Sequence, residues 1–308
     1  MDIVHCIDNG YAALCGVTIT SVCVNNMDEE IHFHILTNNL SFSNREMLKD
    51  LVHKLGKDIE FYDVDERVLD KCPVRKGDHV SLAAYFRILI PDILPKDLDR
   101  VLYLDCDLIV CKNIKKLWNT DILSHSVGAV YDGCTDDMRT YNRLKYDIRY
   151  GYFNTGVLLV NLSYWREHYI ADNLLDFINQ YPERLLYWDQ DALNSILIQS
   201  AKILPFEYNM LDAFYTKDLS LREDYLSAID TQLKSPVILH FSSPDKPWFK
   251  GCEHPLKFLF FKYLDKTPWK GKYPIYPPNM NWKGRLCLLL GNKGIEIRMK
   301  ISKYRTLS

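Results

Sequence analysis

Short apolar runs alternate with longer stretches of helical spacing through the first part of the chain. The runs at residues 3–7, 31–36 and 59–64 are typical of β-strands, while residues 12–24 and 41–57 have the composition of helices. Strands that alternate with helices in this way predict βαβ units. We therefore expect an α/β fold with an open, mostly parallel sheet flanked by helices.

Two local patterns predict how helices begin and end. Ser43 followed by Glu46 has the spacing of a capping box, which predicts a helix start near residue 43. Residues 79–90 have helical spacing and stop before Pro91. Arg87 lies among the apolar positions of this second helix, where a charge needs a partner. It predicts either a structural salt bridge or a contact with a phosphate or a catalytic carboxylate.

One apolar run carries two acids. Residues 100–110 are mostly apolar apart from Asp105 and Asp107, which predicts a strand buried on both faces. Side chains at positions i and i+2 share one face of a strand, about 6.6 Å apart. Buried carboxylates are normally paired, neutralised or bound to a metal, and hard divalent cations take oxygen ligands. The pair predicts either a cation site or two caps where the strand ends. Cys106 would point to the opposite face, and we assign it no chemistry.

The middle of the chain predicts two more strands with polar ends. Residues 127–131 form an apolar run that ends at Asp132, and residues 152–161 form another that is entered through Asn154. The polar residues 133–150 between them have no pattern and predict a long surface loop, of a kind that is often functional.

Polar residues also follow the first strand. Asp8 and Tyr11 lie where the carboxyl end of that strand is expected, and ligands of open α/β sheets bind beyond such ends. Tyr11 could stack on a base, or it could be a surface aromatic at a helix start. Both interpretations remain open from the residues alone.

A third polar cluster precedes a helical stretch. Asp189, Gln190 and Asp191 stand before apolar positions that continue to residue 196. Either acid could be the N-cap of a helix. Three polar groups in a row are more than a cap needs, so this segment is also a candidate site.

The last predicted strand, residues 237–241, carries a histidine. His240 could be a core residue, which is the commoner case for a lone strand histidine, or a metal ligand. Beside two carboxylates, a neutral imidazole would complete a site suited to Mn²⁺. Lys246 follows in a polar loop and could neutralise phosphate as a point charge.

Composition narrows the function further. Of 308 residues, 47% are apolar and 25% charged, and the formal net charge is −2, so the protein is not built to coat nucleic acid. The glycine patterns of dinucleotide-binding and P-loop proteins are absent from the sequence. The 9 cysteines form no CxxC pair, which suits a reducing cytoplasm. We expect neither a signal peptide nor a membrane span, because no suitable apolar run occurs.

Residues 266–308 differ in composition from the rest. They contain many lysines and arginines but one acid, Glu296, and Trp269 and Trp282 are interleaved with tyrosines. Basic residues mixed with aromatic ones predict a peripheral membrane contact. The alternative is a solvated basic tail.

Taken together, the polar segments resemble one known family. Asp105-Cys106-Asp107, then residues 152–156, then Asp189-Gln190-Asp191, and finally His240 with Lys246-Pro247-Trp248 occur in the order seen in the family 8 retaining glycosyltransferases. The chain looks closest to the bacterial lipopolysaccharide α-galactosyltransferases of that family. The likeness extends from residue 3 through residue 248 and into the basic tail.

The resemblance implies a GT-A fold with a catalytic domain at residues 1–265 and a C-terminal extension at residues 266–308. It implies that Asp105, Asp107 and His240 hold Mn²⁺, with Mg²⁺ as the alternative, against the diphosphate of a UDP-sugar. Asp8 and Tyr11 would contact the uracil and ribose.

The same resemblance assigns the remaining candidates. Lys246 would contact the phosphates of the donor. The donor sugar would be contacted by Arg87, Asp132, Asn154 and Asp189. Gln190 would lie near the anomeric carbon, and His79 on the acceptor side.

The function that follows is a metal-dependent retaining transfer of galactose or glucose from a UDP-sugar to a glycan or glycolipid, in bacterial surface polysaccharide or lipopolysaccharide synthesis. The expected location is the cytoplasm, peripherally on the inner face of the membrane. Retention could proceed through a covalent intermediate on Asp189 or Asp191, or by front-face attack. The alternatives are a nucleotidyltransferase that makes a UDP-sugar and a sugar-binding module without catalysis.

Overall fold

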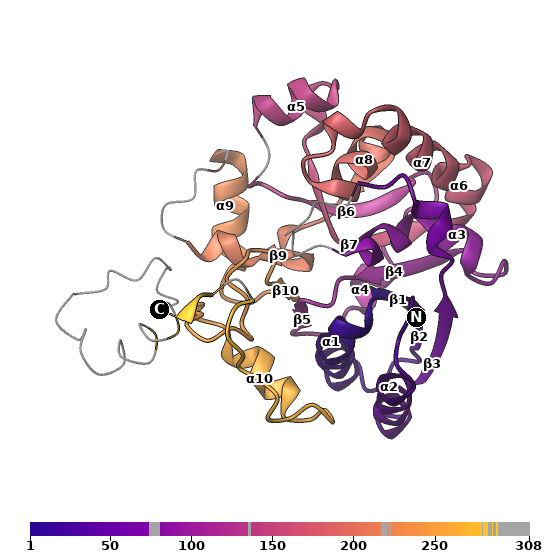
Figure 1. Ribbon diagram of the computed structural model, residues 1–308. Coiled ribbons are helices and arrows are strands. Elements are labelled where there is room, and N and C mark those ends of the chain that lie inside the picture. Colours follow the sequence, from indigo (N-terminus) through magenta and orange to yellow (C-terminus); the bar gives the residue numbers. More distant parts are fainter. Residues whose placement is uncertain are drawn as a thin grey trace.

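The computed structural model describes residues 1–73, 81–134, 137–216, 221, 223–278, 280–282, 285 and 288. A central sheet has helices on both faces (Figure 1). Helices α1 (Ala12–Asn25) and α2 (Phe42–Lys54) cover one face, and α3 (Ile90–Ile93), α6 (Leu162–Glu167) and α7 (Ile170–Gln180) cover the other. The predicted α/β fold is confirmed.

The apolar runs predicted at residues 3–7, 31–36, 59–64, 127–131, 152–161 and 237–241 each contain most or all of a strand, whereas several other elements were not predicted. The described strands are β1 (Asp2–Ile7), β2 (His32–Thr37), β3 (Asp58–Asp63), β4 (Arg100–Leu104), β5 (Leu108–Val110), β6 (Val127–Tyr131), β7 (Phe153–Asn161), β8 (Ala201–Ile203), β9 (Met210–Leu211) and β10 (Ile238–His240). The remaining α-helices are α4 (Lys115–Trp118), α5 (Met138–Leu144), α8 (Trp188–Leu197), α9 (Glu223–Gln232) and α10 (Phe258–Leu264). The 3-10 helices are η1 (Asn9–Tyr11), η2 (Glu66–Leu69), η3 (Leu82–Leu89), η4 (Ile148–Tyr150), η5 (Pro182–Arg184), η6 (Ile198–Ser200), η7 (Phe206–Tyr208) and η8 (Asp212–Tyr215).

The main sheet is parallel except for one strand. Its order is β3-β2-β1-β4-β7-β6-β8, and β7 pairs antiparallel with both of its neighbours, β4 and β6. The pairs β1–β2, β1–β4, β2–β3 and β6–β8 are parallel. A second, smaller sheet has the order β5-β10-β9.

Strand β4 shows how the sequence builds a core on each face. Leu102 and Leu104 pack into the core that includes α1 and α2, while Val101 and Tyr103 pack into the core that includes η3, α6 and α7. This alternation explains the continuous apolar run, because both faces of the strand are buried.

The run at residues 100–110 is not one strand, contrary to the prediction. It divides into β4 and β5, which belong to different sheets, and Asp105 to Asp107 form the link between them. The break arises because β5 pairs antiparallel with the distant strand β10. Strand periodicity therefore does not bring the two acids together. Cys106 is buried in the core beside α1, as expected.

Two helix predictions and one loop prediction need correction. The cap of α2 is Ser41, whose hydroxyl accepts from the Asn44 N–H, so the predicted capping box at Ser43 is wrong. The predicted loop at 133–150 contains α5, capped by Asp137, and η4. The helix predicted at 79–90 is the 3-10 helix η3, followed directly by α3, in which Pro91 lies at the tolerated first turn.

The C-terminal part packs partly on the main body. Trp269 is buried beside Gly16 of α1, where a Cβ would press on the indole. Most residues beyond Asn281, on which the predicted membrane contact depends, lie outside the described residues. Within the described ranges, no helix is both long enough and apolar enough to cross a bilayer.

Candidate active site

A cavity of ≈ 740 Å³ opens at the carboxyl ends of β1 and β4, where a ligand is expected in such a sheet. It is lined by Tyr11, Arg87, Asp105, Asp107, Asp132, Asn154, Asp189, Gln190, His240 and Lys246. Asp8 lines an adjoining hollow that shares Tyr11, Arg87, Asp105 and Asp107 with the cavity. The structure thus brings together the predicted site residues except Asp191, which does not line the cavity, and His79, which lies outside the described residues.

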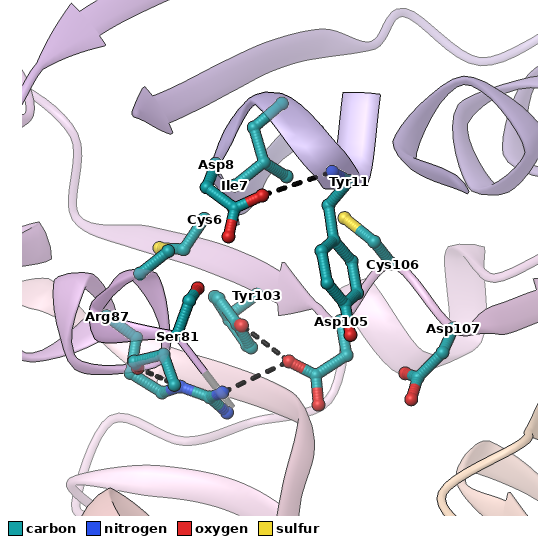
Figure 2. A pocket seen from close by; sticks show the side chains of 12 residues that line it. Cys6, Ile7, Asp8, Tyr11, Ser81, Arg87, Tyr103, Asp105, Cys106 and Asp107 are labelled. Atoms are coloured by element: carbon teal, nitrogen blue, oxygen red, sulfur yellow. Dashed lines mark hydrogen bonds and ion pairs between the residues drawn. The ribbon is translucent and has the colours of Figure 1, made fainter. Parts of the chain in front are cut away.

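The adjoining hollow is walled by the turn after β1. Asp8 Oδ1 accepts from the N–H groups of Gly10 at 2.8 Å and Tyr11 at 3.2 Å, so this acid caps η1. Figure 2 shows that the Tyr11 ring extends from this turn toward Asp105. Burial and the charge of Asp107 raise the pKa of Tyr11 above its usual range, so its hydroxyl stays protonated.

Three potential metal ligands converge at the centre of the site. One ligand atom each from Asp105, Asp107 and His240 lies within 4.8 Å of the other two. His240 Nε2 is 3.1 Å from Asp107 Oδ1 and 3.8 Å from Asp105 Oδ2. Asp107 Oδ1 is nevertheless buried without a hydrogen bond from any described residue. Close polar atoms without hydrogen bonds between them fit a shared cation, so the residues suit the predicted metal.

The other oxygen of each acid is held by the protein. Asp105 Oδ1 accepts from the Tyr103 hydroxyl at 2.5 Å and from Arg87 Nη2 at 3.2 Å. Asp107 Oδ2 accepts from Lys246 Nζ at 2.7 Å. Burial opposes the charge of Asp107, but Lys246 and His240 outweigh it and hold the pKa of this carboxyl well below its usual range. Each acid is therefore oriented by one oxygen and leaves the other facing His240.

Gly156 allows these groups to approach one another. A Cβ on this β7 residue would collide with His240 Cε1 and would lie 2.9 Å from Asp105 Oδ2. The Gly156 carbonyl also accepts from the Asp105 N–H at 2.8 Å. A side chain at this position is excluded, which gives a physical reason for glycine in the motif at residues 152–156.

A group of amides and acids forms the opposite wall of the cavity. Asp132 Oδ2 accepts from Asn154 Nδ2 and from Gln190 Nε2, both at 3.1 Å. Gln190 Oε1 accepts from the Thr155 N–H at 3.1 Å and from Asn154 Nδ2 at 3.2 Å. The orientation of the Gln190 amide is thus set by several partners.

Arg87 joins this wall to the metal ligands. Its Nε lies 3.0 Å from Asp189 Oδ2 but directs its hydrogen to the Ala84 carbonyl, so the contact with Asp189 is an ion pair without a hydrogen bond. Burial raises the pKa of Asp189 to about 6, against the opposing charge of Arg87. Trp188, just before Asp189, has a φ of 47°, a strained value of the kind that gathers at functional sites.

Asp191 has a different environment, although it is only two residues away. It is fully buried and accepts from Arg143 at 2.6 and 3.1 Å, from the Tyr152 hydroxyl at 2.9 Å and from the Tyr187 N–H at 2.6 Å. Neither acid is the helix N-cap that the sequence allowed, because both lie inside α8 and Tyr187 occupies the N-cap position. With both oxygens occupied, Asp191 is not available to a substrate.

Sequence analysis missed two residues that hold cavity residues in place. Asn209 accepts from the His240 ring, and Asp212 accepts from the N–H and hydroxyl of Ser243 in the loop after β10. Both lie between residues 201 and 236, where no local pattern indicated chemistry. Since Asp212 uses the Ser243 N–H, this backbone group is engaged within the protein.

Comparison with known proteins agrees with this geometry. The sequence model described as glycosyl transferase family 8 matches residues 2–252. General stress protein A of Bacillus subtilis is 31% identical, over 87% of this chain and 94% of its own length. Lipopolysaccharide 1,3-galactosyltransferase of Salmonella typhimurium is 26% identical, over 87% of this chain and 79% of its own length.

A solved structure supports the fold. The galactosyltransferase LgtC, in complex with donor and acceptor sugar analogues, matches with a TM-score of 0.80 and 29% identity, over 87% of this chain and 96% of its own. The predicted GT-A fold and the predicted family are both confirmed. The chain belongs to glycosyl transferase family 8, and the protein is a glycosyltransferase.

Proposed function

We propose that this enzyme transfers galactose or glucose from a UDP-sugar to a glycan or glycolipid acceptor, with retention of configuration and with a divalent cation. The observation that carries the proposal is the convergence of Asp105, Asp107 and His240, each of which offers one ligand atom, beside the amide wall of Asn154 and Gln190. Bacterial surface polysaccharide or lipopolysaccharide synthesis is the proposed setting.

Each end of the donor has a matching part of the site. The hollow of Asp8 and Tyr11 would receive the nucleoside, and the cavity wall of Asp132, Asn154 and Gln190 would receive the hexose. Between them, Asp105, Asp107 and His240 would hold the metal that neutralises the charge developing on the leaving diphosphate. A set of two carboxylates and one imidazole favours Mn²⁺, while Mg²⁺ remains the alternative.

The chain's own residues favour front-face attack over a covalent intermediate. The Asp191 oxygens are occupied by Arg143, Tyr152 and the backbone. The Gln190 amide is neutral and a poor nucleophile. Asp189 Oδ2 forms an ion pair with Arg87, which makes this oxygen a weaker nucleophile but leaves it without a hydrogen bond and able to accept one from the sugar. The acceptor hydroxyl would then bond to the anomeric carbon on the face from which the phosphate oxygen departs, and that oxygen would take its proton.

Two cations can assist departure of the diphosphate. Lys246 Nζ is held by Asp107 Oδ2 and by the Phe241 carbonyl at 2.6 Å, at the rim of the metal site. Arg87 lies on the sugar side, between Asp105 and Asp189. Fixed positive charge in a partly dry cavity stabilises a leaving anion more strongly than it would in water.

Product analysis distinguishes this proposal from its alternatives. The purified protein is incubated with MnCl₂ and a panel of UDP-sugars, and UDP and pyrophosphate are measured. We expect UDP from UDP-galactose or UDP-glucose, without pyrophosphate. Pyrophosphate exchange with UTP and a hexose 1-phosphate would instead identify a nucleotidyltransferase. Binding of UDP-sugar without any turnover, with or without acceptors, would identify a binding module.

The basic C-terminal segment is proposed to bind the inner face of the cell membrane. The support is its sequence, together with the exposure of Trp282, whose residue surface is 69% accessible. Full-length protein should sediment with liposomes that contain anionic lipid, and a form truncated before Asn281 should not. Equal sedimentation of both forms would contradict this part of the proposal.

A further inference from the structure

His240 has a buried partner that sequence analysis did not detect. Asn209 is fully buried between η7 and β9, and β9 is the parallel neighbour of β10, the strand that carries His240. Asn209 Oδ1 lies 2.9 Å from His240 Nδ1. This contact is on the side of the imidazole away from the two acids, which face Nε2.

A chain of hydrogen bonds fixes the orientation of the Asn209 amide. The Gly156 N–H donates to Asn154 Oδ1 at 2.9 Å, and a backbone N–H can only donate, so this Asn154 atom is an oxygen. The same oxygen accepts from Asn209 Nδ2 at 2.8 Å. Since Asn209 presents its NH₂ group to Asn154, its oxygen must face His240.

The orientation of Asn209 in turn fixes the proton on His240. An amide oxygen accepts but does not donate, so the hydrogen of this contact belongs to His240 Nδ1. In the neutral imidazole the lone pair then lies on Nε2, which faces Asp105 and Asp107. This is the tautomer that a metal ligand coordinating through Nε2 requires.

We propose that Asn209 is a positioning residue for the metal site: it holds His240 in the Nδ1–H tautomer and directs the Nε2 lone pair at the cation held by Asp105 and Asp107. This inference rests on the proposed metal-dependent function. Metal-bound histidines usually donate their second ring N–H to an oxygen, and loss of that partner typically lowers metal affinity about 10- to 100-fold.

The same bonds connect the metal site to the proposed sugar site. Asn154, which accepts from Asn209, also donates to Asp132 and to Gln190. Two amide side chains therefore join the metal ligand His240 to the wall that would contact the hexose. Asn209 acts through His240, because Asn209 itself does not line the cavity.

Mn²⁺ affinity measures this role without reference to turnover. Free Mn²⁺ is followed by electron paramagnetic resonance during titration of the full-length protein with MnCl₂. Asn209→Ala should weaken binding about 10- to 100-fold. His240→Ala should weaken it as well, and Asn209→Ala in the His240→Ala background should add no further loss, because the two residues act through one ligand.

Asn26→Ala is the matched control. Asn26 is 1% exposed, donates to the Val22 carbonyl at 2.8 Å and accepts from the Ile114 N–H at 2.8 Å, so its buried amide also donates one bond and accepts one, but to backbone groups away from the site. This variant should keep wild-type Mn²⁺ affinity. An equal loss of Mn²⁺ affinity in Asn26→Ala and Asn209→Ala would overturn the proposal, since it would mean that replacing any buried asparagine weakens metal binding.

Nuclear magnetic resonance of the wild type tests the tautomer directly, even if Asn209→Ala fails to fold. With ¹⁵N-labelled histidine and ¹¹³Cd²⁺, we expect the His240 Nε2 to couple to cadmium and Nδ1 to carry the proton. A proton on Nε2 would overturn the inference. If His240→Ala left Mn²⁺ affinity unchanged, the proposed metal site itself would fail. If His240→Ala weakened binding and Asn209→Ala did not, only the role of Asn209 would fail.

Discussion

The first turn of α8 presents two aspartates to two different regions of the molecule. Asp191 points inward, where Arg143, Tyr152 and the Tyr187 N–H occupy both of its oxygens. Asp189 points to the cavity, where Oδ2 faces Arg87 without a hydrogen bond. Both acids are buried, so burial alone does not separate a structural acid from a functional one.

The distinguishing property is the number of oxygens that the protein leaves free. Asp105 and Asp107 follow the pattern of Asp189, because each keeps one oxygen for the cavity while the other is bound by protein groups. Removal of a saturated buried carboxylate leaves its partners unpaired and destabilises the fold, whereas a partly free carboxylate costs stability and remains able to bind a ligand.

The largest expected effect follows from removing Asp191, the acid whose two oxygens are both hydrogen-bonded within the protein. Asp191→Ala leaves the Arg143 guanidinium and the Tyr152 hydroxyl without their shared partner, so the free energy of unfolding should fall by about 3 kcal/mol. Urea denaturation followed by circular dichroism measures it. A loss below about 1 kcal/mol would show that the hydrogen bonds of Asp191 contribute little to the stability of the fold.

Asp189→Asn should reduce catalytic turnover strongly and the free energy of unfolding only slightly. Arg87 keeps Asp105 and the carbonyls of Ala84 and Thr155, so unfolding free energy should fall by only about 1 kcal/mol. Turnover of the UDP-sugar should fall about 100-fold, because a charge beside the reacting sugar is lost. Steady-state kinetics on both aspartate variants at matched folded concentration tests the contrast, which equal activity losses would contradict.

Gly156→Ala tests the crowding around the free oxygens. The added Cβ would collide with His240 and press on Asp105 Oδ2, so Mn²⁺ affinity should fall about tenfold. Gly128→Ala, in the neighbouring strand β6, is the control, since its Cβ would meet Leu204 at 3.3 Å and no site residue. Unchanged Mn²⁺ affinity in Gly156→Ala would show that the ligands have room to rearrange.

Cys106→Ala should have the smallest effect. This thiol lies between the two acids in sequence but is buried in the core, and burial raises its pKa so that it stays neutral. Unfolding free energy should fall by about 1 kcal/mol through the small cavity, and turnover should stay within about twofold. A large loss of turnover without a loss of stability would show that the Cys106 thiol takes part in the chemistry, which this account does not expect.

Sequence analysis found the acids and the main strands from local patterns, and it missed features that depend on distant residues. Asp105 and Asp107 stood out because acids interrupt an apolar run, but the break between β4 and β5 depends on pairing with β10, more than a hundred residues away. The helix α5 was missed because it buries only Thr140, Tyr141 and Leu144 and so has little apolar periodicity.

Asn209 could not be predicted for a related reason. Its role depends on a histidine in another strand and an amide in a third, and one polar residue in an aromatic segment gives no signal of either. The division at residue 265 also remains a prediction, as do the roles of the individual site residues.

The metal dependence of turnover tests the central claim most directly. Wild-type protein is stripped with EDTA, and UDP release from the preferred UDP-hexose is measured before and after MnCl₂ is restored, alongside Asp105→Asn and Asp107→Asn. We expect activity to vanish on stripping, to return with Mn²⁺ in the wild type, and to remain at least about 100-fold lower in both variants. Turnover that survives EDTA, or that is unchanged in the two variants, would contradict the account.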